Sequence, residues 1–131
     1  MNVSPAGLAA QFRLQQRMAA GIAATYGAFN YIQKVRDALA GKTDAASKTL
    51  DAALTALQNG PAGVGVAHRD LGRRLNDQIP ADIAPTPSVI AGVDGPCAAI
   101  DTALDGLRKL QATMDASLPR WNPPAAPACG M

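Results

Sequence analysis

The chain has 131 residues, with 12 lysines and arginines against 10 acidic residues and a net charge of +2. Because the cations are scattered among aspartates, there is no basic stripe of the kind that follows a phosphate backbone, and we expect no nucleic-acid binding. No apolar run approaches the roughly 18 residues that a bilayer-spanning helix needs. The sequence opens without a signal-peptide pattern, so we expect either a cytoplasmic protein or a piece of a longer one whose signal lies elsewhere.

The composition predicts the fold class. The hydrophobic fraction is 48%, but alanine supplies much of it, and the aromatic residues are 2 Phe, 2 Tyr and 1 Trp. Runs of β-branched and aromatic residues, which are typical of strands, are absent. We therefore predict one all-α domain, an elongated antiparallel bundle of three to four helices, two long and two short, over residues 1–118. Its core should be thin and built from helix–helix contacts.

The first and longest helix is predicted over residues 5–40. Ser4-Pro5 supplies a hydroxyl N-cap and a proline at the first helical position, and Gly41 suits the position after the last turn. The expected inward stripe is Leu8, Met18, Ile22, Phe29, Ile32, Val35 and Leu39, with Gln11, Gln15 and Thr25 in its gaps. Gly21 and Gly27 each weaken the helix by about 1 kcal/mol against alanine. Either another helix approaches closely there, or the glycines reflect only a GC-rich codon bias.

Two short helices are predicted next. The first covers residues 44–58 after a cap signal at Thr43-Asp44, with Leu50, Leu54 and Leu57 on one face. Asn59-Gly60-Pro61 ends it, and residues 60–65 are expected to form a flexible loop. The second covers residues 66–79 and is closed by Pro80. Its inward residues are Leu71, Leu75 and Ile79, and its outward residues are Arg69, Arg73, Arg74 and Asp77.

The last helix is predicted over residues 87–118, with Thr86 as its N-cap and Pro87 at its first position. Its inward stripe is Val89, Val93, Cys97, Ile100, Leu104, Leu107, Met114 and Leu118. Gly95-Pro96 predicts a kink or a break at 95–96, because a proline inside a helix removes one hydrogen bond and costs about 3 kcal/mol.

Residues 119–131 are predicted to form a flexible, proline-rich tail. Trp121 either packs against the end of the bundle or stays with the tail. Cys97 and Cys129 have neither zinc spacing nor a CxxC pattern. We expect Cys97 to be a small buried hydrophobe and Cys129 a free tail thiol, with a disulfide between them as the alternative.

The sequence predicts no catalytic, cofactor-binding or metal-binding residue. His68 is the only histidine, and a metal site or a catalytic triad needs partners that are not present, so we expect a surface or capping histidine. Asp101 and Asp105 lie one turn apart, as a carboxylate pair for general acid–base catalysis would. On an alanine-rich helix we expect this pair to be a solvated surface, and we expect neither an enzyme nor a cofactor.

The order of the motifs carries a family resemblance. They are Leu8-x-x-Gln11-x-x-Leu14, Met18, Ile22, Ile32-x-x-Val35-Arg36-x-x-Leu39, Ala81-Asp82-x-x-Pro85-Thr86-Pro87 and Leu118-Pro119-x-Trp121-Asn122. Over residues 6–123 the chain resembles the C-terminal helical segment of bacterial sortilin-like β-propeller proteins, which are often labelled BNR-repeat glycosyl hydrolases. Gly95-Pro96 departs from that pattern, in which the last helix is unbroken.

The resemblance implies a secreted or envelope-associated parent with an N-terminal propeller, to which this segment is a helical appendage. Propeller strands and Asp-box motifs are absent from the sequence, so we expect a detached or truncated piece. The hydrolase label concerns the propeller, and the resemblance therefore implies no catalytic residue here.

The patterns together favour a non-catalytic helical packing or interaction module. Its expected partner is a β-propeller domain, in cis or in trans, or a second copy of the chain, because a thin core leaves apolar surface exposed. One alternative is a part of a hydrolase-labelled protein whose propeller is absent from this chain. The other is a membrane-surface amphipathic protein, for which the first helix has too few cations beside its apolar face.

Overall fold

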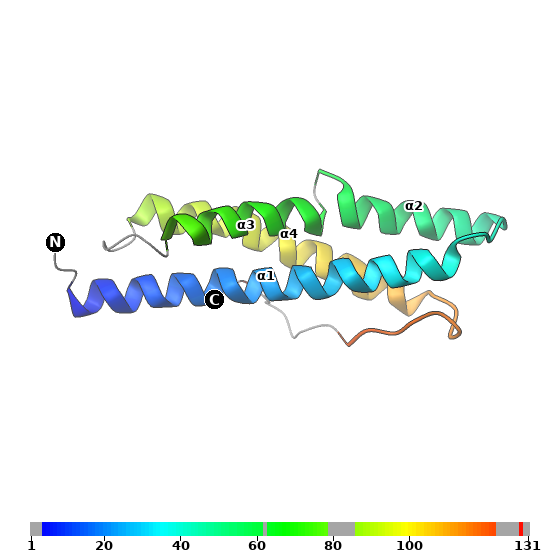
Figure 1. The fold of residues 1–131 in the computed structure, drawn as a ribbon, viewed down its shortest axis with the longest axis horizontal. Coiled ribbons are helices and arrows are strands. Elements are labelled where there is room, and N and C mark those ends of the chain that lie inside the picture. The colour runs from blue at the N-terminus through cyan, green and yellow to red at the C-terminus, as the bar shows by residue number, and fades with distance from the viewer. Residues whose placement is uncertain (1–3, 62, 79–85, 123–128, 130–131) are drawn as a thin grey trace.

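The fold is an elongated bundle of helices in this computed structural model, which describes residues 4–61, 63–78, 86–122 and 129. The helices are α1 (Pro5–Leu39), α2 (Ala45–Asn59), α3 (Val64–Gln78) and α4 (Pro87–Ala112). The described residues contain no β-strand. α2 and α3 lie end to end and antiparallel to α1, and α4 runs back beside them (Figure 1). The predicted all-α bundle of two long and two short helices is confirmed.

Three helices begin where short polar side chains cap them. The Ser4 hydroxyl accepts a hydrogen bond from the backbone N–H of Gly7 at 3.0 Å. The Asp44 carboxylate accepts one from the N–H of Ser47 at 3.0 Å, and the Thr86 hydroxyl accepts one from Val89 at 3.2 Å. Each bond satisfies one N–H that the first helical turn leaves without a partner. These starts follow from local sequence alone, and all three were predicted.

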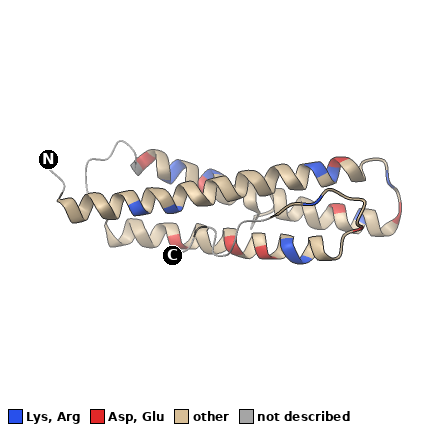
Figure 2. Ribbon diagram, turned by 90° about the horizontal axis from the view of Figure 1, so that it is seen from below, with Lys and Arg blue, Asp and Glu red and all other residues tan. Residues whose placement is uncertain are grey.

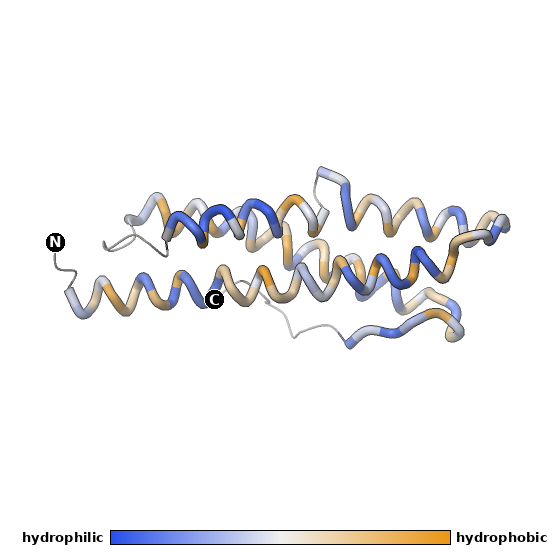
Figure 3. The backbone as a smooth tube through the Cα atoms, in the orientation of Figure 1, coloured by the Kyte–Doolittle hydropathy of each residue, from blue (hydrophilic) through white to orange (hydrophobic). Residues whose placement is uncertain are grey.

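The bundle is organised around one buried face of α1, which we call the inner seam. Its members alternate at spacings of four and three residues along the whole helix: Gly7, Gln11, Leu14, Met18, Gly21, Thr25, Ala28, Ile32, Val35 and Leu39. This is the heptad spacing of helices that pack along their length. Because several members are small or polar, the orange of apolar residues on α1 is discontinuous (Figure 3).

The inner seam corrects the predicted inward stripe at two positions. Leu8 is 49% exposed and Phe29 is 37% exposed, whereas both were expected to face the core. Each follows a small seam residue, Gly7 and Ala28, and therefore lies on the next face of the helix. Tyr31 is only 4% exposed, although the predicted stripe omitted it.

Gly21 marks a close approach between elements, as one of the two interpretations of this glycine required. A Cβ atom at this position would lie 2.7 Å from the Cys129 Sγ and 2.7 Å from the Leu71 Cδ1. Gly27 has no such constraint, because a Cβ there would meet the Trp121 ring at an ordinary 3.8 Å.

The middle of the bundle differs from the prediction at the junction of the two short helices. A turn closed by a 2.8 Å hydrogen bond from the Gly63 N–H to the Gly60 carbonyl leads directly into α3. α3 therefore begins at Val64, two residues before the predicted start, because Val64 is buried (1% exposed) against the core. Ile79 and Pro80, which were predicted to end this helix, lie outside the described residues.

Gln58, at the end of α2, is a buried polar residue that the sequence did not reveal. It is 1% exposed. Its amide N–H groups donate to the Phe29 carbonyl at 3.3 Å and to the Gln33 side chain at 3.1 Å. Its amide oxygen accepts a 2.7 Å hydrogen bond from the guanidinium of Arg36. These bonds offset the loss of water around the amide and fix the end of α2 against α1.

α4 ends at Ala112 rather than at the predicted 118. The Thr113 hydroxyl donates to the Leu110 carbonyl at 2.8 Å, and the Asp115 carboxylate accepts from the Ser117 N–H at 2.8 Å. Both are local turns that compete with helix formation. Met114 and Leu118 are nevertheless buried, as predicted.

Pro96 lies inside α4, and the helix continues through it without a break. The helix therefore forms although Pro96 removes one backbone hydrogen bond, because packing of its buried residues holds it in place.

The start of the predicted tail is packed, which corrects the expectation of a flexible segment from residue 119 onward. Trp121 stacks on Tyr31 with 5.5 Å between the ring centroids. The Gln111 side chain donates to the Trp121 carbonyl at 3.0 Å and accepts from its N–H at 2.8 Å. The Tyr31 hydroxyl also donates to the Pro119 carbonyl at 2.9 Å. Burial raises the pKa of Tyr31, so its hydroxyl remains a donor at neutral pH.

Cys97 and Cys129 form a disulfide, with their Cα atoms 5.0 Å apart. The expectation of a free tail thiol is therefore wrong, although Cys97 is buried as predicted (2% exposed). The cause is tertiary: the chain turns back after α4 (Figure 1), and Cys129 lies against Gly21 of α1. There Arg17 donates to the Cys129 carbonyl at 3.2 Å and also pairs with Asp94 at 2.9 Å.

Replacement of Gly21 by alanine is expected to destabilise the protein by about 1–2 kcal/mol, because the new methyl group overpacks against the Cys129 sulfur. The matched control is Gly72→Ala, since nothing lies within 4 Å of a Cβ at that position. That control should stabilise α3 by about 0.5–1 kcal/mol. Urea unfolding of both variants measures the two changes. Equal stabilisation by both substitutions would contradict the close approach at Gly21.

Replacement of both cysteines by serine is expected to lower the free energy of unfolding by about 3.5 kcal/mol. The disulfide joins residues separated by 32 positions, and a closed loop of that length restricts the unfolded chain by about this amount. Dithiothreitol should produce the same loss in the natural sequence and no further loss in the double-serine variant. An unchanged unfolding midpoint after reduction would contradict this role.

Candidate functional site

His68 is half-buried and bonded to α1, so it is not the surface or capping residue that was expected. Its Nδ1 lies 2.8 Å from the Thr25 hydroxyl oxygen. That hydroxyl donates its one proton to the carbonyls of Gly21 and Ile22, each at 3.0 Å. The direction of the bond between this hydroxyl and His68 is set by the tautomer of the imidazole.

The structure does not bring the predicted carboxylate pair into an acid–base arrangement. Asp105 forms an ion pair with Lys109 at 3.0 Å on the exposed face of α4. Asp101, one turn earlier, is half-buried and has interactions of its own. Within the described part of the chain, no three His, Cys or Asp side chains lie together as potential metal ligands.

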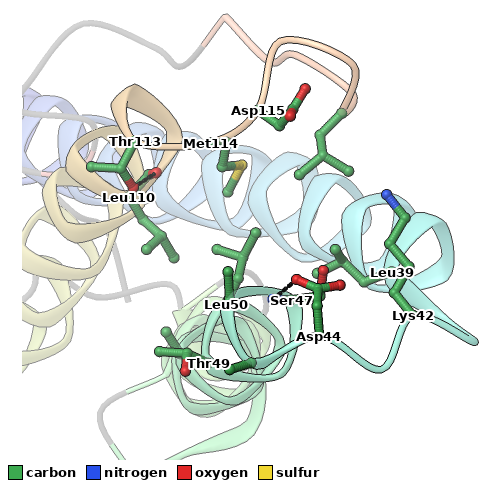
Figure 4. Close-up of a pocket in the computed structure, with 14 residues that line it drawn as sticks. Leu39, Lys42, Asp44, Ser47, Thr49, Leu50, Leu110, Thr113, Met114 and Asp115 are labelled. Atoms are coloured by element: carbon green, nitrogen blue, oxygen red, sulfur yellow. Dashed lines mark hydrogen bonds between the residues drawn. The ribbon is translucent and has the colours of Figure 1, made fainter.

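An open cavity of about 790 Å³ lies at the end of the bundle where α1, α2 and α4 meet (Figure 4). Its apolar walls come from Leu39, Leu50, Leu110, Met114 and Leu118. Lys42, Asp44 and Asp115 line its charged part. Hydrogen bonds from Ser47 lower the pKa of Asp44, and the backbone N–H of Ser117 lowers the pKa of Asp115. Both carboxylates are therefore ionised at neutral pH, and each accepts a hydrogen bond within its own turn.

A different surface, the outer strip of α1, exposes large apolar side chains. It lies one residue ahead of the inner seam and keeps the same alternation of four and three: Leu8, Phe12, Gln15, Ala19, Ile22, Tyr26 and Phe29. Phe12 is 60% exposed and Tyr26 is 64% exposed. At 1.5 Å per residue the strip is roughly 31 Å long. The exposed large residues form two pairs, Leu8 with Phe12 and Tyr26 with Phe29, and Ile22 between the pairs packs partly against the core. Single exposed apolar residues are ordinary, whereas grouped ones are less so.

α3 borders the outer strip near its C-terminal end. Val66 is exposed beside it (37%). A cavity of about 170 Å³ opens there between the two helices. Its lining residues are Tyr26, Phe29, Asn30, Gly65, His68 and Arg69. The hydrogen bond between Thr25 and His68 therefore fixes the imidazole at the edge of an aromatic hollow.

The charge carried by α1 before Asp37 is positive. α1 carries no acidic residue before Asp37, and the ribbon shows only basic colour on its N-terminal half (Figure 2). Arg13 and Arg69 are exposed, and neither forms an ion pair with another described residue.

Sequence reasoning identified an apolar surface in general but missed Phe12 and Tyr26. Their signal was present, because both continue the four-and-three spacing from Leu8 to Phe29. It was hidden because Leu8 and Phe29 were assigned to the core, which left the other two without an assigned face.

The chain matches no known protein family, curated protein or solved structure to which it was compared. Among the described residues, no helix has the length and apolarity that a membrane crossing would require.

Acidification is expected to destabilise the bundle between about pH 5 and pH 3. The folded-state pKa of Asp44 and of Asp115 lies below the unfolded value of about 3.9. The unfolded state therefore binds more protons, and stability is lost as the pH falls through the folded pKa values. Urea midpoints across this range measure the loss. The Asp44→Asn and Asp115→Asn double variant, which keeps a polar side chain at each turn, should show a shallower pH dependence.

Proposed function

We propose that this chain is a non-catalytic helical interaction module that binds another protein through the outer strip of α1. The observation that supports the proposal most directly is the exposure of Phe12 and Tyr26 in one row with Leu8 and Phe29. Full burial of an aromatic side chain of this kind contributes about 1.5–3 kcal/mol. A partner that covers the row would supply the apolar contact that the thin core of the bundle does not.

The resemblance to the helical segment of sortilin-like proteins suggests a β-propeller domain as that partner, in cis or in trans. Self-association is the other form that the same surface permits. In both cases the chain contributes packing and position, and any activity implied by the hydrolase label belongs to a propeller that this sequence does not contain.

The proposal can be tested by photo-crosslinking from the outer strip. A photoreactive phenylalanine derivative placed at position 12 or 26 should give one discrete adduct, made of two chains or of the chain plus one partner. The control is the same group at position 109, since the Lys109 side chain is 78% exposed on α4. The purified adduct components should then associate with the natural chain and fail to associate with a Phe12→Ser, Tyr26→Ser variant.

The variant must also be shown to fold. Phe12 and Tyr26 are mostly exposed, so their replacement should change stability by no more than about 0.5 kcal/mol. Identical adducts from positions 12, 26 and 109, or no adduct from any of them, would overturn the proposed function.

A further inference from the structure

We infer that a hollow between α1 and α4 binds a small amphiphile, a linear alkyl chain that ends in one carboxylate. The hollow, which we call the α1–α4 hollow, has a volume of about 650 Å³. Small-molecule sites in proteins usually measure about 300–1,000 Å³. The hollow lies on the opposite flank of the inner seam from the outer strip. Its occupation is therefore independent of the partner proposed for the outer strip.

The floor of the α1–α4 hollow is apolar and follows one face of α1. Ala10, Leu14, Arg17 and Ala20 line it at successive spacings of four, three and three residues, and Ile90 lines it from α4. Such spacings place side chains on one side of a helix. The row from Ala10 to Ala20 is roughly 15 Å long at 1.5 Å per residue. The small alanines leave room beside it in which an extended alkyl chain can lie.

Two arginines one turn apart give the α1–α4 hollow a positive charge. Arg13 and Arg17 both line it. Arg13 is exposed and forms no ion pair with another described residue. Arg17 pairs with the Asp94 carboxylate of α4 at 2.9 Å. Among the described lining residues and the groups bonded to them, one positive charge is thus left uncompensated, and it matches the single charge of a carboxylate.

Arg17 is held in place before any ligand binds. Its side chain is only 15% exposed. Its guanidinium donates to Asp94 at 2.9 Å and to the Cys129 carbonyl at 3.2 Å. These two bonds use two of the five N–H donors of a guanidinium. Because the side chain is already ordered, an anion that binds beside it costs little further side-chain entropy.

The charge and the lining of the hollow argue against other occupants. A cationic amphiphile would lie beside two guanidinium groups of like charge. A polypeptide segment would bring backbone N–H and C=O groups that need hydrogen-bond partners. Among the described lining residues, Gln16 is the one uncharged polar side chain. A membrane surface is recognised by dense clusters of lysine and arginine, whereas this hollow has two arginines and one paired acid.

Calorimetric titration of the full-length oxidised chain with decanoate, kept below the concentration at which it forms micelles, tests the site. Decanol and decyltrimethylammonium carry the same chain with a neutral and a positive end. We expect decanoate to bind about five-fold more tightly than decanol, as one surface ion pair allows. Decyltrimethylammonium should bind most weakly. Octanoate should bind about four-fold more weakly than decanoate, because each half-buried CH₂ contributes about a factor of two.

Two pairs of variants locate the ligand. Ala20→Leu fills the hollow and should weaken the binding of decanoate and decanol alike, by about ten-fold or more. Its control is Ala38→Leu, which adds the same atoms at an exposed position further along α1. Arg13→Gln should weaken decanoate about five-fold and leave decanol unchanged. Lys34→Gln removes another exposed charge of α1 and should change neither ligand. Circular dichroism confirms that all four variants fold.

Other results would overturn the site. Absence of decanoate binding, equal binding of the three ten-carbon ligands, or an Ala20→Leu variant that binds normally would each exclude it. Loss of decanoate binding in the Phe12→Ser, Tyr26→Ser variant would move the ligand to the outer strip. Flotation with phosphatidylserine vesicles without binding of monomeric decanoate would replace the small ligand by a membrane surface. None of these results changes the crosslinks expected from positions 12 and 26, so the two proposals fail separately.

Discussion

The structure depends on close packing along the inner seam of α1, where small residues let neighbouring elements approach. Gly21 is the tightest point, because the disulfide and Leu71 occupy the space that a side chain would need. Met18 and Ile32 supply fully buried apolar bulk on either side of it. A core made this way is long and narrow, so it can support a helix such as α1 but can shelter only one side of it. The exposed outer strip is the direct geometric consequence.

The parts of the fold that the sequence predicted are those decided by short-range chemistry. Ser4, Asp44 and Thr86 cap helices wherever the following residues can form a turn, so their positions required no tertiary knowledge. The parts that were missed depend on contacts between distant segments. Cys129 meets Cys97 only because the chain folds back after α4. α4 ends early because the side chains of Thr113 and Asp115 form local turns. The spacing of apolar residues, from which the longer helix was predicted, contains no information on these turns.

The candidate surface was missed for a related reason. Glycine, alanine and threonine contribute most of the middle of the inner seam, and they carry little hydrophobic signal. A search for large apolar residues therefore selected Leu8 and Phe29 as core residues and assigned no place to Phe12 and Tyr26. Close packing of small residues reverses that assignment in the middle of the helix, where Gly21, Thr25 and Ala28 face inward and Tyr26 and Phe29 stay exposed. The chain has five aromatic residues, 2 Phe, 2 Tyr and 1 Trp. Exposure of several of them is informative, because folded proteins usually bury large apolar side chains.

α2 and α3 lie end to end along α1 and are held in place by different contacts. α3 lies beside Gly21 and the covalent link between Cys97 and Cys129. α2 is attached through Leu54 and the hydrogen bonds of Gln58. Local opening should therefore follow this division: amides of α2 exchange with solvent through fluctuations confined to one end, whereas those of α3 exchange only when the linked half opens as a unit. We therefore expect one bundle in shape to open as two cooperative units.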